Sequence, residues 1–368
     1  MAKLLVINLG GSSSKLAIYD NKKCLADKSI QHTQEEMAAN PLSKQQVAYR
    51  SSLIKAWMNE NGYDITDFDA IAIRATPIKQ AVHGGTYKIE GRYRELVLEQ
   101  YFPDQKPVHG TRLAVPVAET LMGDHKIPMY VTDPGGSNEL PPVARVTGLK
   151  EYPRFPTGHA LNQKAVARRY AEMIGKPYKD CRIVVVHLGS GITVGAHENG
   201  GIVDLNEGGD GYGPFSPLRA GTVESRVMLD LCFDFGMTKA EVKQKIRNEA
   251  GILSHLGTDD MRVVEKMAQV DSYAALVYEA MAYNIAKSVG ARVAILKGNI
   301  DGILITGAIA HSNVFINKIK AYVEQFAPVA AYPGEFENEA LAYGALRVIS
   351  GEEEPQTIIE DLSDFTKL

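Results

Sequence analysis

The chain has 368 residues, of which 40 are basic and 44 are acidic, and this length suits about two domains. The acidic excess argues against a nucleic-acid-binding protein, because such proteins usually carry a basic face. No apolar run approaches the roughly 20 residues of a membrane span, and the opening "LLVINL" is too short for a secretion signal. Three widely spaced cysteines (Cys24, Cys181 and Cys232) predict free thiols in a reducing compartment, and therefore a cytoplasmic protein.

The stretch "LLVINLGGSSSKLAIYD" (4–20) places glycines, serines and a lysine between two apolar runs. Small residues let backbone N–H groups approach an anion closely, so this turn is typical of phosphate binding. A Walker P-loop is disfavoured, because its spacing is absent and "LAIYD" after Lys15 alternates like a strand. We expect strand, turn and strand over 3–20, and a third strand near 24–32. A dehydrogenase is disfavoured because G-x-G-x-x-G does not follow the first strand.

A second stretch, "RIVVVHLGSGITVGAHENGGIVDL" (182–205), repeats this pattern of strands and glycine turns about half a chain later. Glycine hairpins are common without any duplication. Two such meanders half a chain apart nevertheless favour duplicated domains.

The remaining segments alternate between helical and strand patterns. A helix is predicted over 43–62, where Gly62 ends it, and buried strands over 68–74 and 128–133. The second half predicts a long, largely buried helix (272–296), then two strand–turn–helix units (302–312 and 329–350) and a solvated tail from Gly351. This order predicts an α/β fold with mixed sheets.

Polar side chains collect at the predicted strand ends. Arg74 and Asp133 each end an apolar strand, His187 interrupts "VVVHLGSG", and Arg219 lies in the Gly/Pro-rich run 208–222. Such positions are where α/β proteins place ligands. Taken singly, each side chain is as typical of a turn, a salt bridge or a core. Together with two phosphate-type hairpins they favour phosphoryl transfer.

Several motifs in chain order resemble the acetate kinase family, in its butyrate kinase (short-chain and branched-chain fatty acid kinase) branch: "VINLGGSSSK", "GHALNQKAVARR", "HLGSGITVGAH", "DGYGPFSPLRAGT", "ITGAIAHS" and "YPGEFENEALAYGALRV". The resemblance runs from residue 4 to about 350. It implies duplicated actin-like (ribonuclease H-like) domains with mixed five-stranded sheets and flanking helices, with ATP between them. The N-terminal domain would span 1–150, with a C-terminal helix at about 340–368 packing back on it. The C-terminal domain would span 151–339 and carry nucleotide and dimer contacts, in a homodimer or higher homo-oligomer. Hinges are expected near 145–155 and 330–345.

The resemblance also implies roles for individual residues. Arg74 would face the substrate carboxylate beside His109 and Gly158, and Arg219 would stabilise the phosphoryl group, with His159, His187 and Asp133 also in the catalytic centre. Magnesium would be held by Asn8, Asp133 and Glu339, and Glu337 stays open as an alternative to Glu339. The nucleotide-binding residues implied are Asn8, Ser12, Ser13, Lys15, Gly189, Ser190, Gly191, Gly307 and Ala308.

The implied reaction is reversible, direct in-line transfer from ATP to a short-chain fatty acid, giving an acyl phosphate and ADP. A carboxylic acid with a pKa of about 4–5 is already ionised at pH 7, so no general base is required. Arginines and Mg²⁺ would offset the repulsion between the carboxylate and the polyphosphate.

This sequence departs from the family pattern at Gly11, Ala75, Thr76, Arg112, Ala308 and Gly158. Gly11 replaces a hydroxyl residue, and Gly158 replaces an aromatic residue beside the acyl pocket. Gly158 would enlarge that pocket if nothing else fills it, whereas Ala75 and Thr76 would narrow it. Two alternatives therefore stay open: a kinase of the same fold for acetate, propionate or another carboxylate, and a non-catalytic nucleotide-binding relative.

Overall fold

The structure is a computed structural model that describes residues 2–135, 137, 139–155, 157–209 and 212–362. Gly136 of the "PGGS" motif, residues 210–211 of the Gly/Pro-rich run and the last residues of the chain lie outside this description. The chain divides into two compact units. Of the described residues, the first contains those up to Ser137 and from Phe336 to Leu362, and the second contains those between them.

The first unit is built on a mixed sheet in the order β3-β2-β1-β4-β6-β5. Its strands are β1 (Lys3–Leu9), β2 (Ser13–Asp20), β3 (Lys23–Gln31), β4 (Ala70–Ile73), β5 (Thr86–Lys88) and β6 (Met129–Thr132). The first three strands pair antiparallel, whereas β4 runs parallel to β1, and β6 runs parallel to β4. The described residues thus form six strands rather than the expected five, because β5 adds an antiparallel edge to β6.

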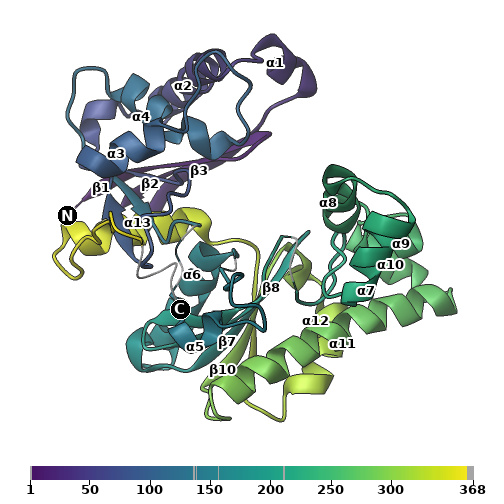
Figure 1. Ribbon diagram of the computed structural model, residues 1–368. Helices are drawn as coiled ribbons and strands as arrows, with labels where there is room; N and C mark the ends of the chain where they lie inside the picture. Colours follow the sequence, from purple (N-terminus) through teal and green to yellow (C-terminus); the bar gives the residue numbers. More distant parts are fainter. Residues whose placement is uncertain (1, 136, 138, 156, 210–211, 363–368) are drawn as a thin grey trace. The chain divides into compact units, whose positions relative to one another are not determined.

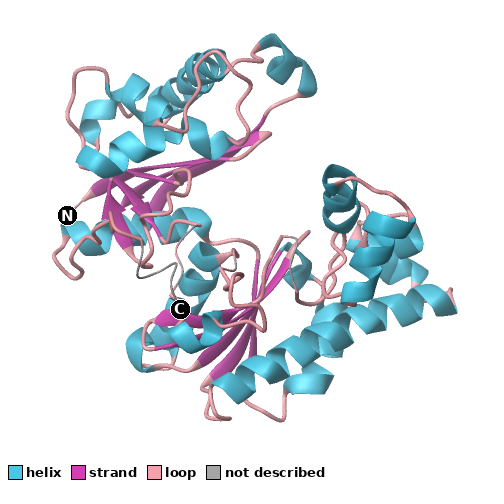
Figure 2. Cartoon of the chain, in the orientation of Figure 1, coloured by secondary structure: helices cyan, strands magenta, loops and turns pink. Residues whose placement is uncertain are grey.

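Helices cover both faces of this sheet (Figure 2). They are α1 (Gln34–Ala39), α2 (Ser43–Glu60), α3 (Gly91–Leu98), α4 (Ala114–Met122) and α13 (Glu337–Ile349). Helices α2 and α4 pack together on one side, while α13 crosses β1, β4 and β6 on the other (Figure 1). The core between α2, α4 and the sheet includes Ile7, Ile54 and Val117, all fully buried.

The second unit repeats this plan. Its strands are β7 (Ile183–Leu188), β8 (Ile192–Glu198), β9 (Gly201–Leu205), β10 (Gly302–Gly307) and β11 (Val329–Pro333). Its helices are α5 (Pro142–Arg145), α6 (Ala160–Met173), α7 (Ser225–Leu229), α8 (Lys239–Asn248), α9 (Gly251–Leu256), α10 (Met261–Met267), α11 (Ser272–Ile295) and α12 (Asn313–Val323). A one-turn π-helix, Asp230–Asp234, follows α7.

The strand orders confirm the predicted duplication. The order β9-β8-β7-β10-β11 matches β3-β2-β1-β4-β6, with the same antiparallel meander followed by two parallel strands. A register shift also recurs at the same place in the two sheets. It lies between Ile18 and Tyr19 where β2 pairs with β3, and between Ala196 and His197 where β8 pairs with β9.

Two expectations about helices were wrong. The C-terminal helix expected at about 340–368 instead spans Glu337–Ile349. The segment from Gly351 is mostly exposed, as expected, but it also contacts the first unit: the N–H group of Gln356 donates to the carbonyl of Thr86, and Ile358 packs on the first core. Helix α11 is buried on one face, whereas Leu276 and Tyr283 on its other face are exposed. In the described part of the chain, no helix is long and apolar enough to cross a membrane.

Candidate functional site

Parallel pairing brings three of the predicted site residues to one edge of the first sheet. Asn8 lies at the end of β1, Arg74 directly follows β4, and Asp133 directly follows β6. Because these strands are parallel neighbours, their carboxyl ends share an edge, which is where ligands bind in α/β sheets.

The first turn of α13 adds a carboxylate to this edge. Glu337 accepts a 2.8 Å hydrogen bond from the amide Nδ2 of Asn8 and forms a 3.1 Å ion pair with Nη1 of Arg74. Glu339 lies near Tyr19 of β2 instead. Burial raises the pKa of Tyr19, and the charges of Cys24 and Glu339 raise it further. The described contacts therefore group Glu337, rather than Glu339, with Asn8 and Arg74.

Close packing of α13 on the sheet fixes where this carboxylate lies. A Cβ atom at Gly344 would be 2.0 Å from Oγ1 of Thr132 on β6, so only glycine permits this approach. The small residues Ala340 and Ala345 of the same helix are also buried against the unit.

Asp133 adopts a backbone conformation that is unusual for its side chain. Its φ is +43°, in the left-handed region, and it is nearly fully buried. Its Oδ1 accepts the N–H of Gly85 at 2.8 Å, and its own N–H donates to the carbonyl of Gly85. Non-glycine residues held in this region cluster at functional sites, so the strain supports a functional role.

The first glycine/serine hairpin exposes Gly11 and Ser12, while Ser13 and Lys15 are half-buried. A Cβ atom at Gly11 would meet nothing within 4 Å, so the departure there leaves open space.

Two other departures in this unit lie inside the protein. Ala75 packs in the first core, and Thr76 is also buried. Neither side chain is exposed beside Arg74.

His109 precedes a short 3-10 helix, Gly110–Leu113, whose last turn carries the half-buried Arg112. The backbone N–H of Thr111 donates to Nδ1 of His109 at 3.2 Å, which leaves the proton of the neutral ring on Nε2. Desolvation and the guanidinium groups of Arg74 and Arg50 lower the pKa of His109.

In the second unit, a buried hydrogen-bond network fixes the ring of His187. The amide Nδ2 of Asn162 donates to Nδ1 of His187 at 2.9 Å and to Oγ1 of Thr306 at 3.2 Å, and the Thr306 hydroxyl donates to the carbonyl of Gly334. The proton of neutral His187 therefore lies on Nε2, the atom that faces Gly189 of the second hairpin. Burial lowers the pKa of His187 to about 4, so the ring is neutral at pH 7.

His159 stacks on His187. The ring centroids are 3.8 Å apart and the planes 10° from parallel. Nδ1 of His159 lies 3.0 Å from the Thr193 hydroxyl, which also accepts a hydrogen bond from Gln163. The structure thus brings together these two predicted histidines.

Arg219 lies against the second hairpin. A Cβ atom at Gly191 would be 1.9 Å from Nη1 of Arg219, so a larger residue there would displace the guanidinium. The hydroxyl of Ser216 accepts the N–H of Arg219 at 3.0 Å and donates to the carbonyl of Ser190 at 2.5 Å. These bonds tie the Arg219 loop to the hairpin 189–191.

The predicted adenosine loop begins with a glycine that the backbone requires. Gly307 has a φ of +94°, and a Cβ atom there would be 2.3 Å from the carbonyl oxygen of Leu188. Ala308 follows it, exposed, at the start of a short 3-10 helix, Ala308–His311.

The space beside Gly158 is filled. A Cβ atom there would be 2.6 Å from Cδ2 of Leu205 and 3.3 Å from Cγ2 of Thr193. The missing aromatic side chain therefore leaves no hollow at this position.

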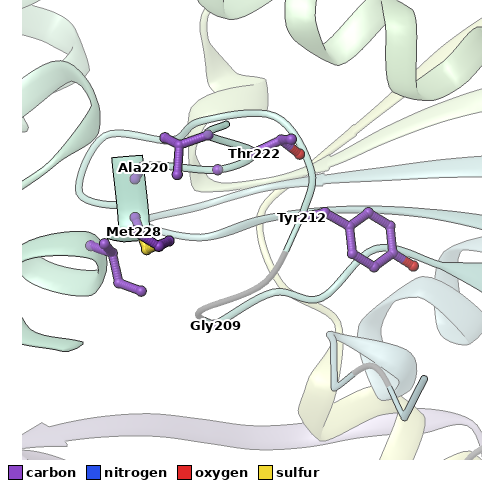
Figure 3. Close-up of a pocket in the computed structure, with 8 residues that line it drawn as sticks. Gly209, Tyr212, Ala220, Thr222 and Met228 are labelled. Carbon is purple, nitrogen blue, oxygen red and sulfur yellow. The ribbon is translucent and has the colours of Figure 1, made fainter. Parts of the chain in front are cut away.

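A pocket of about 170 Å³ lies beside the segment that directly follows Arg219. Figure 3 shows Tyr212, Thr222 and Met228 around it. Val223 and Ile246 add apolar surface to its lining.

Within the described residues, no group of three or more His, Cys, Asp or Glu side chains is placed to hold a metal ion. Mg²⁺ usually takes one or two carboxylates together with phosphate oxygens and water. Asp133 and Glu337 offer such carboxylates at the first sheet's edge.

Sequence reasoning missed two buried residues. Asn162 orients His187, and it lies in the quoted motif "GHALNQKAVARR" without an assigned role. Arg50 is fully buried and bonds to the first hairpin. Its signal was available: it falls among Val47, Ile54 and Trp57 on the apolar face of the predicted helix.

The chain is similar to known proteins over nearly its whole length. The model of the acetokinase family matches residues 144–359. A probable butyrate kinase of Clostridium botulinum is 40% identical over 352 residues, covering 95% of this chain and 98% of that protein. Butyrate kinase 1 of Clostridium acetobutylicum is 38% identical over 354 residues, covering 96% of this chain and 98% of that protein.

The fold is likewise similar to that of a solved acetate kinase from Porphyromonas gingivalis. The TM-score is 0.76 at 18% identity, with 95% of this chain and 100% of that chain covered. The topology, the family match and the full-length relatives lead to one conclusion: the chain belongs to the acetokinase family.

Proposed function

We propose that this chain phosphorylates a short-chain fatty acid, butyrate or a branched relative, with ATP. An oxygen of the fatty-acid carboxylate attacks the γ-phosphorus, the bond from that phosphorus to the β–γ bridging oxygen breaks, and ADP leaves with the bridging oxygen. The products are an acyl phosphate and ADP, and the reaction is reversible. Full-length identity of 38–40% to proteins named as butyrate kinases supports this substrate class.

The observation that carries the proposal is the ion pair between Arg74 and Glu337. The Arg74 side chain is 42% exposed and already holds a carboxylate at 3.1 Å. A planar guanidinium binds carboxylates well. A fatty-acid carboxylate can take the same place, while Glu337 keeps its bond from Asn8.

The remaining roles follow from charge and geometry. Arg219, together with the N–H groups of the hairpin 189–191, would meet the charge that develops on the phosphoryl oxygens. Nε2 of neutral His187 can donate a hydrogen bond there without abstracting a proton, and no base is needed because the substrate is already ionised. His109 and His159 are proposed to line the same phosphoryl path.

Asn8, Asp133 and Glu337 are proposed to hold Mg²⁺, either directly or through water, with Glu339 less favoured by its position near β2. When bound, Mg²⁺ would neutralise charge on the β- and γ-phosphates. The hairpin residues Ser12, Ser13 and Lys15 are proposed to bind phosphate, and Gly307 and Ala308 to border the adenosine.

A hydroxamate assay with ATP, Mg²⁺ and acids from acetate to six-carbon branched acids tests the proposal. Hydroxylamine traps only an activated acyl group, so a signal that peaks at four or five carbons is expected. A peak at acetate or propionate would select the alternative substrate. ATP binding without a signal for any acid would select a non-catalytic nucleotide-binding protein.

We further propose a cytoplasmic homodimer. Tyr273, Leu276 and Tyr283 leave an exposed apolar strip along α11, which suits contact with a second copy. The free thiols of Cys24, Cys181 and Cys232 suit a reducing compartment. Light scattering of the purified protein measures the number of subunits.

A further inference from the structure

Arg50 of α2 is a fully buried cation beneath the first hairpin. Its Nη1 donates to the carbonyls of Gly10 (3.2 Å) and Ser13 (3.0 Å) and to the hydroxyl of Ser14 (3.2 Å). Its Nη2 donates to the carbonyl of Gly11 at 2.8 Å and to Gln46 at 3.4 Å. One guanidinium thus ties together most of the turn.

These bonds orient the turn's peptide groups. Arg50 takes the carbonyls of Gly10 and Gly11, while the N–H of His32 donates to the carbonyl of Ser12. In a planar trans peptide the N–H points opposite to the carbonyl, so the N–H groups of Gly11 and Ser12 point away from Arg50. Both residues are exposed. The partly positive N–H groups of Gly11 and Ser12 therefore point outward, as the backbone N–H groups do in anion-binding nests.

Arg50 also adds a full charge behind those dipoles. Among the described residues its partners are neutral, and no carboxylate pairs with it. Burial lowers the pKa of Arg50 to about 10, so it stays charged at neutral pH. A buried charge without a counter-ion is costly, and a bound polyphosphate would offset that cost.

We propose that Arg50 is a positioning residue for ATP: it holds the first hairpin with its N–H groups outward and supplies the uncompensated charge that attracts the terminal phosphates. The inference rests on the proposed ATP site. It does not depend on which acid is phosphorylated or on turnover.

The test measures binding of adenosine, AMP, ADP and ATP to the full chain by calorimetry, for wild type, Arg50→Lys and Arg50→Gln. For Arg50→Gln we expect ATP affinity to fall about tenfold or more, ADP affinity to fall less, and adenosine affinity to stay unchanged. The ATP affinity of Arg50→Lys should lie between those of wild type and Arg50→Gln, because lysine keeps the charge but lacks the two guanidinium nitrogens that bond to the hairpin. Equal loss for all four ligands, or none, would overturn the proposal.

Ile54→Ala supplies the matched control. Ile54 lies one turn further along α2, is fully buried, and makes no hydrogen bond to the hairpin. Its truncation should lower the melting temperature of the protein, because it leaves a cavity in the first core, without making the loss of nucleotide affinity depend on the number of phosphates. A phosphate-dependent loss in Ile54→Ala would assign the effect to stability and contradict the role of Arg50.

A wild-type measurement covers the case in which the Arg50 variants do not fold. Hydrogen exchange at the amides of Gly11 and Ser12 should slow when ATP is added, and not when adenosine is added. Unchanged exchange would overturn the outward orientation on which the proposal depends. If nucleotides bind as expected but no acid gives hydroxamate, the proposed function fails and the role of Arg50 stands.

Discussion

Arg219 lies against Gly191 of the second hairpin, so its removal tests the proposed phosphoryl transfer directly. Arg219→Ala should lower kcat by about 100- to 1,000-fold, because in the role proposed for Arg219 the lost charge would meet the phosphoryl oxygens mainly in the transition state. Nucleotide affinity should change little. Steady-state kinetics and calorimetry separate the two effects.

Arg262→Ala is the matched control, because that side chain is 89% exposed in the same unit. It should leave kcat and nucleotide affinity unchanged. Undiminished turnover in Arg219→Ala would refute the role assigned to Arg219.

His187 makes stability depend on pH. Its pKa is about 4 in the folded protein and about 6.5 in an unfolded chain, so the unfolded state binds more protons between these values. Stability should therefore fall as pH drops from about 6.5 to about 4, with a loss of about 2 kcal/mol already at pH 5. His187→Gln should lack this part of the pH-dependent loss of stability. Urea unfolding of both proteins at pH 7 and pH 5 measures it, and equal losses in the two proteins would contradict it.

Residues at strand ends could be located from sequence, because apolar runs and glycine turns mark where strands stop. Arg74 and Asp133 follow β4 and β6 as expected. The choice between Glu337 and Glu339 could not be made, because it depends on the rotation of α13 about its axis. The contact between Gly344 and Thr132, two segments far apart in the chain, fixes that rotation.

At the scale of elements, the close packing of α13 on β6 predicts that two glycine substitutions change the free energy of unfolding in opposite directions. Gly344→Ala should lower the free energy of unfolding by about 1–3 kcal/mol, because the new methyl meets Thr132. It should also reduce turnover, since α13 carries Glu337. Gly290→Ala on α11 meets nothing within 4 Å and should raise stability by up to about 1 kcal/mol. Urea unfolding compares them, and shifts of the same sign would show that α13 is not packed as described.

The strand meanders were predictable because glycine turns and buried strands repeat in each half of the chain. The contacts of the segment after Ile349 were not predictable, because its acidic composition indicates only that it is solvated. Its contacts are with residues far away in the sequence: the N–H of Ile359 donates to the carbonyl of Gln80, and Glu360 pairs with Arg92. Composition alone cannot report such contacts. Similarly, the continuous apolar pattern of α11 hid the fact that only one face is covered.

At the scale of the molecule, the candidate site residues are distributed over both units. Arg74 and Asp133 lie in the first unit, and Arg219 and His187 lie in the second. The chain passes between the units after Ser137, ahead of the segment 145–155 expected to cross, and again before Phe336, inside the expected 330–345. We propose that the two units close when both substrates bind, because transfer to a carboxylate rather than to water requires that water be kept from the reacting phosphoryl group.

The chain's own thiols can report this closure. Cys24 in the first unit and Cys232 in the second are exposed, whereas Cys181 is buried. Donor and acceptor dyes on Cys24 and Cys232 should change their energy transfer when Mg²⁺, a non-hydrolysable ATP analogue and butyrate are added together. The change should exceed that caused by either ligand alone, because closure depends on contacts to both.

Dilution of the labelled protein with excess unlabelled protein removes transfer between copies in an oligomer. A Cys24→Ser variant, which carries a dye on the second unit alone, controls for effects of the ligands on the dye. Identical transfer with and without the two ligands would mean that the units do not move. In that case water would have to be excluded by loops within each unit, and the glycine/proline-rich run around Arg219 would be the first segment to examine.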